Sequence, residues 1–170
     1  QDAPAAPLWH QGWYRFARRL DSPNFGPRPA GSAVDLVVVH SISLPPGRFG
    51  GDEVQRLFTN TLDWDAHPYF QSIRGLQVSS HFYIRRGGEL WQFVSCDARA
   101  WHAGASQWRG RGNCNGRSHG LDVPADLDLA VAIFNLDFAE AGVIQQFGQF
   151  AHQFGIDLHS AGFAVHILLR

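Results

Sequence analysis

Histidines are the residues of this chain with the clearest capacity for chemistry. The sequence holds nine of them, and a neutral imidazole is both a common metal ligand and an acid–base group near neutral pH. His40 has the most informative position, because it ends the β-branched run VDLVVVH, which is typical of a buried strand. A zinc site for hydrolysis needs three protein ligands and one open position for water. At a strand end, His40 is the best-placed candidate ligand.

The other histidines carry weaker signals. His81 lies inside a predicted strand and is expected in the core or behind a ligand, and His67 precedes a proline in a predicted turn. His102 stands between a tryptophan and an Ala-Gly pair, which lets a substrate or another backbone segment approach closely. Substrate contact and packing both stay open for it. Three more histidines have weaker positions, since His10 and His119 have no evident partner and His152 lies on the surface of a predicted helix.

The elements that position these residues follow from periodicity and turn residues. A β-branched run predicts a strand, apolar residues three and four apart predict a helix, and two β-rich runs around a Gly-Gly turn predict a hairpin. Pro/Gly-rich stretches predict loops. The predicted elements are strands at 34–40, 81–84, 90–94, 127–138 and 162–169, helices at 52–59 and 140–154, and loops at 21–32 and 41–51.

Composition excludes several classes of protein. The chain has 170 residues and a net charge of −1, which argues against a dedicated nucleic-acid binder with a basic face. No apolar run is long enough for a membrane span, so no membrane partner is expected. Residues 1–12 are expected to form a flexible leader and residues 13–170 a single domain that acts as a monomer. Cys96 and Cys114 are expected to be free thiols.

Four segments carry a resemblance to a known family. They are VVVHSISLPPGRFGG (37–51), LFTNTLDWDAHPYF (57–70), VSSHFYIRRG (78–87) and RAWHAGASQWRGRGNCN (99–115). Together they resemble the AmpD-like branch of the zinc N-acetylmuramoyl-L-alanine amidases, which serve cell-wall recycling and are related to phage-type amidases and peptidoglycan recognition proteins. The resemblance extends from about residue 13 to residue 115.

The resemblance implies an α/β (α+β) fold with a mixed central β-sheet flanked by helices. It implies a Zn²⁺ ion held by two histidines and one aspartate, and a water molecule that attacks the amide joining (anhydro)muramic acid to L-alanine in a muropeptide. His40 matches the first zinc ligand. The residues that match substrate contacts are Ser41 (where the family usually has Asn), Trp101, His102, Arg111 and Asn115. A cytoplasmic location is implied, with a periplasmic one as the alternative.

Residues 116–170 depart from the family pattern. Asp122 takes the position of the glutamate that acts as general base, and His166 is the best match for the second zinc ligand, with His159 behind it. The third ligand would lie beyond Arg170, and the family's lysine is missing because the chain has no lysine. This segment is either a divergent natural end or a misread stretch of sequence, through a frameshift, a sequencing error or a mis-assignment. The alternative function is that of a non-catalytic muropeptide-binding relative with an incomplete zinc site.

Overall fold

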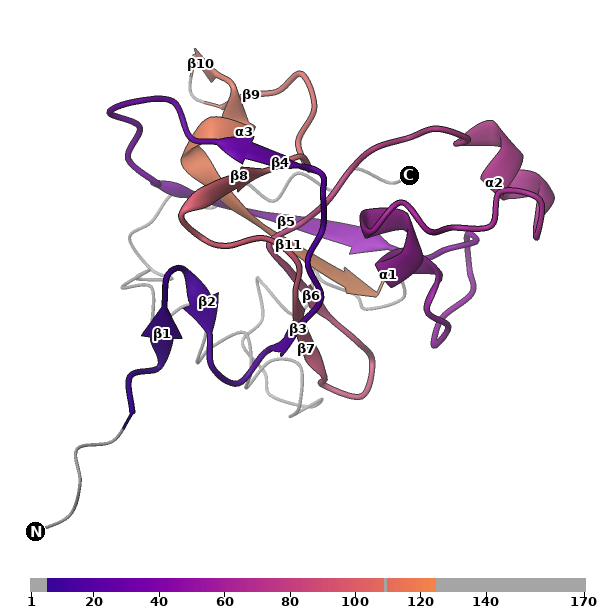
Figure 1. Cartoon of the computed structure of the whole chain (residues 1–170). Helices are drawn as coiled ribbons and strands as arrows, with labels where there is room; N and C mark the ends of the chain where they lie inside the picture. Colours follow the sequence, from indigo (N-terminus) through magenta and orange to yellow (C-terminus); the bar gives the residue numbers. More distant parts are fainter. Residues whose placement is uncertain (1–5, 109, 125–170) are drawn as a thin grey trace, which may run out of the picture.

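The computed structural model describes residues 6–108 and 110–124. Their centre is a five-stranded mixed sheet in the order β3-β7-β6-β11-β5. Its strands are β3 (Arg18–Arg19), β5 (Leu36–Ile42), β6 (Phe82–Ile84), β7 (Leu90–Gln92) and β11 (Ser118–Pro124). β11 pairs in parallel with both β5 and β6, while β6 and β7 are antiparallel. The predicted mixed sheet with flanking helices is confirmed (Figure 1).

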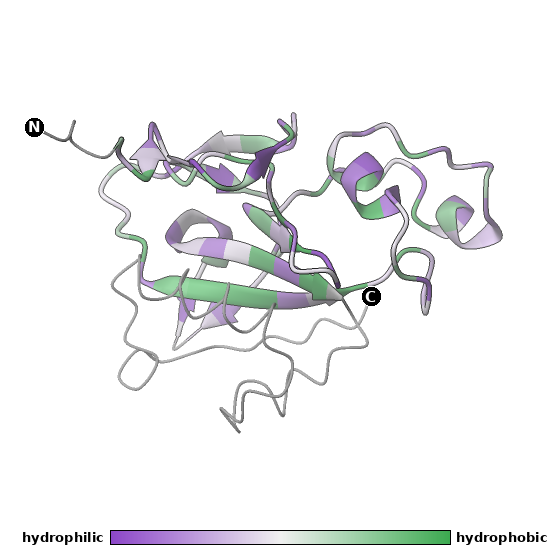
Figure 2. Cartoon of the chain, turned by 90° about the horizontal axis from the view of Figure 1, so that it is seen from below, coloured by the Kyte–Doolittle hydropathy of each residue, from purple (hydrophilic) through white to green (hydrophobic). Residues whose placement is uncertain are grey.

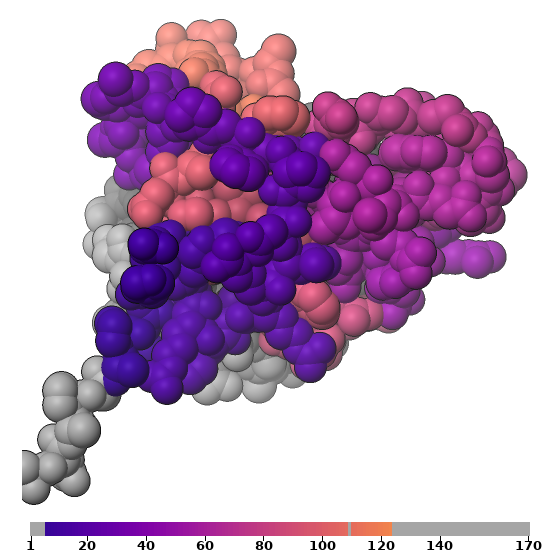
Figure 3. Space-filling view, in the orientation of Figure 1, coloured from indigo at the N-terminus to yellow at the C-terminus, as the bar shows by residue number. Residues whose placement is uncertain are grey.

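In the part of the chain that the structure describes, three two-stranded ladders and three short helices surround the sheet (Figure 1). The ladders are β1 (Trp9–His10) with β2 (Trp13–Tyr14), β4 (Phe25–Pro27) with β8 (Ala98–Ala100), and β9 (Gln107–Trp108) with β10 (Arg111–Gly112). The helices are α1 (Glu53–Phe58), α2 (Pro68–Ser72) and α3 (Cys114–Arg117). The segment with α1 and α2, drawn in magenta, forms a lobe at one side of the molecule (Figure 3).

Alternation along the strands sends their side chains to two faces of the sheet. Val37 and Val39 of β5 join Phe82 and Leu121 in a core on one face. On the other face, α1 and α2 cover a second core that includes Tyr83 of β6. Figure 2 shows the resulting hydrophobic stretches along the central strands. Because β5 is buried on both sides, its continuous β-branched run is explained.

Several predicted elements are confirmed. The strand predicted at 34–40 is β5, although the loop expected to begin at Ser41 begins after Ile42. The predicted helix is α1, with Asp52 and Thr59 as its cap residues. The predicted hairpin is formed by β6 and β7. The elements expected at 127–138, 140–154 and 162–169 lie outside the described residues.

The expected leader boundary after residue 12 falls within an ordered hairpin. β1 pairs with β2, and the ring of Trp9 stands edge-on to Phe82, with 6.4 Å between the ring centroids. The described fold therefore includes residues before residue 13, because an aromatic side chain there is anchored on the sheet. That residues 13–170 form one domain stays a prediction.

Candidate active site

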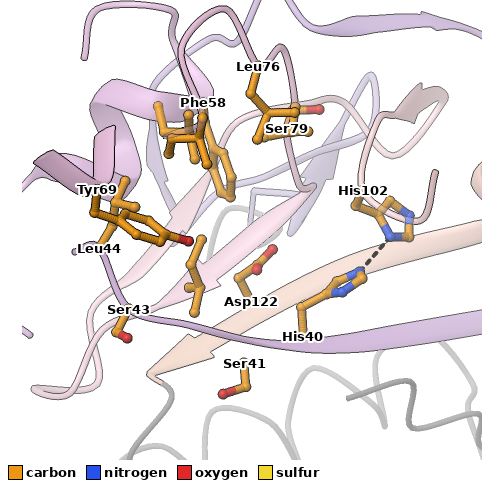
Figure 4. A pocket seen from close by; sticks show the side chains of 14 residues that line it. His40, Ser41, Ser43, Leu44, Phe58, Tyr69, Leu76, Ser79, His102 and Asp122 are labelled. Atoms are coloured by element: carbon orange, nitrogen blue, oxygen red, sulfur yellow. Dashed lines mark hydrogen bonds between the residues drawn. The ribbon is translucent and has the colours of Figure 1, made fainter. Parts of the chain in front are cut away.

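His40 and Asp122 lie side by side at the wall of a cavity. The parallel register pairs Asp122 of β11 with His40 of β5, so both side chains leave the same face of the sheet. His40 is 6% exposed and Asp122 5%. Figure 4 shows the Asp122 carboxylate pointing into the space between His40 and the apolar residues of the cavity. Asp122 belongs to a central strand of the sheet and not to a loop.

The rest of the cavity wall comes from the end of β5 and the loop after it, from α1 and α2, and from the segment before β6. Its apolar members are Ile42, Leu44, Leu57, Phe58, Tyr69, Ile73, Leu76 and Val78. The polar groups His40, Asp122, His102, Ser43 and Ser79 complete the lining, together with Ser41. A mostly apolar cavity with a few convergent polar groups is the usual form of a small-molecule site. Leu57 and Phe58 belong to the apolar spacing that predicts the helix at 52–59, but that spacing gave no sign that they border a cavity.

His102 is the direct hydrogen-bonding partner of His40. Its Nδ1 lies 2.8 Å from Nε2 of His40 (Figure 4), and its Nε2 lies 3.0 Å from Oγ of Ser118. Burial, reinforced by the neighbouring imidazoles of His40, His81 and His119 and by Arg28, holds the pKa of His102 well below its usual value. His102 is therefore neutral near pH 7. Ser118 had no signal in the sequence, because it lies 16 residues from His102.

The backbone around His102 is fixed by Asn115. The Oδ1 atom of Asn115 accepts hydrogen bonds from the backbone N–H groups of His102 and Ala103, at 3.1 and 2.8 Å. On the other side, Gly120 allows the ring to approach β11, since a Cβ atom there would lie 2.7 Å from Cγ of His102. Asn115 and Gly120 thus hold the loop and the ring of His102 in place.

The other predicted substrate contacts are placed differently. Ser41 follows His40 on β5, and Figure 4 shows its side chain directed away from His40 and Asp122. Trp101 is half-buried, and its backbone N–H donates to Oγ of Ser79. Arg111 is exposed on β10, where it forms an ion pair of 3.1 Å with Asp35. Of the predicted contacts, the cavity lining includes Ser41 and His102.

A second group of buried histidines lies behind the cavity. His81 and His119 pack with 4.9 Å between their ring centroids, beside the guanidinium of Arg28, which donates to the carbonyls of Cys96 and Ser118. Burial lowers the pKa of His81 well below its usual value and that of His119 to about 4. The core position predicted for His81 is confirmed. For His119 the prediction was wrong, because β11 carries it into the interior, where its Nε2 meets the carbonyl oxygen of Cys96.

The described residues fit one position of a zinc site. His40 is a buried imidazole at the cavity wall, and its Nε2 is engaged by a second residue, as is usual for metal-binding histidines. Within residues 6–108 and 110–124, however, no three His, Cys, Asp or Glu side chains are grouped to hold a metal ion. His166, the predicted second ligand, and His159 lie outside the described residues. Cys96 and Cys114 are free thiols, as predicted.

Comparisons with known proteins give a consistent picture. A family model described as N-acetylmuramoyl-L-alanine amidase matches residues 30–124. The chain is 50% identical over 123 residues to the 1,6-anhydro-N-acetylmuramyl-L-alanine amidase AmpD of Escherichia coli, which covers 72% of this chain and 67% of that one. The same protein of Citrobacter freundii is also 50% identical, with 72% and 66% covered. The match thus spans about two thirds of the length of these relatives.

Solved structures support the same fold. A crystal structure of AmpD matches with a TM-score of 0.67 at 50% identity, covering 69% of this chain and 66% of that one. The solution structure of Citrobacter freundii AmpD matches with a TM-score of 0.56 at 39% identity, covering 94% and 82%. The mixed sheet described above is therefore the fold of these proteins.

Proposed function

Since the chain belongs to the N-acetylmuramoyl-L-alanine amidase family, we propose that it hydrolyses the amide between 1,6-anhydro-N-acetylmuramic acid and L-alanine in muropeptides released during cell-wall recycling. The observation that carries this proposal is the pairing of His40 with Asp122 at the wall of the cavity. Amide hydrolysis needs a group that takes a proton from water and a polarising group at the carbonyl. In this proposal Asp122 takes the proton, and His40 holds the zinc ion that would polarise the carbonyl.

Asp122 is the proposed general base. One of its carboxylate oxygens accepts the proton of the attacking water, and the same group then delivers a proton to the departing nitrogen of L-alanine. Its position on β11 between β5 and β6 keeps the carboxylate from swinging away, as a loop carboxylate would. The apolar wall formed by Leu57, Phe58 and Tyr69 limits water around it, which strengthens electrostatic interactions inside the site.

His40 is the proposed zinc ligand in the described part of the chain. Zn²⁺ bound there would act as a Lewis acid toward the substrate carbonyl and activate water for attack. We propose His166 as the second ligand on the strength of its sequence position. The predicted substrate contacts remain Ser41, Trp101, His102, Arg111 and Asn115. Two of these also have a positioning part, because His102 is hydrogen-bonded to His40 and Asn115 holds the backbone of His102.

The setting of the reaction is also a proposal. Among the described helices, none is both long and apolar enough to cross a bilayer. We propose that the protein acts as a monomer in the cytoplasm, where recycled muropeptides are the substrate, and that it has no nucleic-acid partner. The near-neutral net charge of −1 agrees with the last point.

The test is release of stem peptide from a 1,6-anhydromuramyl-peptide, followed by mass spectrometry with zinc supplied. We expect the wild-type chain to release the peptide and Asp122→Asn to lower the rate by about 10²-fold or more. Asp97→Asn, the same change at an exposed position, is the matched control and should not alter the rate. Full activity in Asp122→Asn would overturn the role of Asp122. Binding of the muropeptide without release by the wild-type chain would instead support a non-catalytic relative.

A further inference from the structure

A continuous row of hydrogen bonds runs from the start of β11 to His40. The hydroxyl of Ser118 donates to the backbone carbonyl of Cys114 at 2.6 Å. The same Oγ lies 3.0 Å from Nε2 of His102, and Nδ1 of His102 lies 2.8 Å from Nε2 of His40. Ser118 is fully buried, and His40 and His102 are each 6% exposed, so the row is shielded from bulk water.

Counting protons along this row fixes the direction of each bond. A carbonyl oxygen can only accept, so the single hydroxyl proton of Ser118 is used toward Cys114. Nε2 of His102 must then donate to Oγ of Ser118. A neutral imidazole has one N–H, which leaves Nδ1 of His102 as an acceptor. The proton shared with His40 therefore belongs to Nε2 of His40.

The distances agree with these directions. The bond of 2.6 Å between Ser118 and Cys114 lies in the range of O–H···O bonds, and the contact of 3.0 Å from Ser118 to His102 is typical of N–H···O. The opposite arrangement would turn the Ser118 hydroxyl toward His102 and leave the buried carbonyl of Cys114 without this donor. A buried acceptor left without a hydrogen bond destabilises the fold, so the first arrangement is favoured.

We propose that Ser118 and His102 are positioning residues that set the tautomer of His40, with the proton on Nε2 and the lone pair on Nδ1. Nδ1 is then the ring nitrogen that can accept a proton or bind a cation at the cavity. Asn115 and Gly120 help to fix this arrangement, because Asn115 holds the loop of His102 and Gly120 lets its ring pack against β11. The use of Nδ1 in catalysis rests on the proposed function, whereas the tautomer itself does not.

The test is the protonation pattern of the histidine ring nitrogens, read by ¹⁵N NMR on the full chain without metal or substrate. The spectrum is recorded at about pH 8, above the ordinary histidine pKa of about 6.5. We expect His40 and His102 of the wild-type chain to be protonated on Nε2. In Ser118→Ala the acceptor of the His102 N–H is lost, and the two tautomers of His40 should become mixed.

Ser80→Ala is the matched control. Ser80 is another fully buried serine near the His102 ring, since both would contact a Cβ atom at Gly120, but its Oγ forms no hydrogen bond within the described part of the chain. Its removal should leave the His40 pattern unchanged. Protonation of His40 on Nδ1 in the wild-type chain would overturn the proposal, and so would an unchanged pattern in Ser118→Ala. Neither result depends on whether the protein cleaves muropeptides.

Discussion

Replacement of Gly120 by alanine tests whether the close packing of the His102 ring against β11 supports the site. A Cβ atom at residue 120 would lie 2.7 Å from Cγ of His102, 2.8 Å from its Cδ2 and 2.8 Å from Oγ of Ser80. All three distances are shorter than Cβ contacts in proteins, so the imidazole must move away from β11. That movement pulls Nδ1 of His102 away from Nε2 of His40, which are now 2.8 Å apart.

The size of the effect follows from two opposing terms. Inserting one methyl group into a packed interior costs about 1–3 kcal/mol, while replacing glycine stabilises by about 0.4–1 kcal/mol through the unfolded chain. We therefore expect Gly120→Ala to lower the free energy of unfolding by about 1–2 kcal/mol. Release of stem peptide should fall as well, because His40 loses its orienting partner.

Urea denaturation and the peptide-release assay measure the two effects on the same preparations. Gly87→Ala is the matched control, because a Cβ atom at residue 87 meets nothing within 4 Å, and its stability should match or exceed that of the wild-type chain. The reasoning is refuted if Gly120→Ala unfolds at the same urea concentration as Gly87→Ala and keeps full activity.

Two further predictions concern buried charge. Burial lowers the pKa of His119 to about 4, so below pH 6.5 the unfolded chain takes up a proton on this residue more readily than the folded chain does. The contribution of His119 to the free energy of unfolding is therefore complete above about pH 6.5. It falls as the pH drops toward 4, by about 3 kcal/mol. Urea denaturation at pH 7 and pH 4.5 should show a smaller loss for His119→Asn, and an identical loss would contradict this. Asp35→Asn should lower the free energy of unfolding by about 1–2 kcal/mol, because its partner Arg117 has a side chain that is only 10% exposed. Arg111→Gln, at the exposed end of the same cluster, should lower it by less than about 1 kcal/mol. Equal losses of stability in thermal denaturation would count against this difference.

Local sequence signals were sufficient to predict an element where the apolar pattern of that segment itself determines how it is buried. The valines of β5 and the spacing of Val54, Leu57 and Phe58 in α1 describe their own burial, and both elements are where they were expected. β11 was missed because His119, Gly120 and Asp122 are typical of loops. Its strand form comes from pairing with β5 and β6, which is tertiary information that local propensity does not contain.

The site shows the same division. His40 could be identified from one strand, but its partner His102 is 62 residues away, and no spacing rule joins them. The sequence left His102 open between packing and substrate contact, and the structure shows a third role in the hydrogen bond to His40. His67, expected in a turn before a proline, accepts a hydrogen bond from the backbone N–H of Tyr69 at the start of α2. This short helix was not revealed by periodicity.

The central claim is that this chain hydrolyses the amide between the muramic acid lactyl group and L-alanine. The most direct measurement is cleavage of a 1,6-anhydromuramyl-peptide in ¹⁸O-labelled water, with both products weighed by mass spectrometry. We expect one ¹⁸O atom in the lactyl carboxylate and an unlabelled stem peptide with a free L-alanine amine. Label in the peptide fragment, a cut at another bond, or unchanged activity in His40→Ala would contradict it.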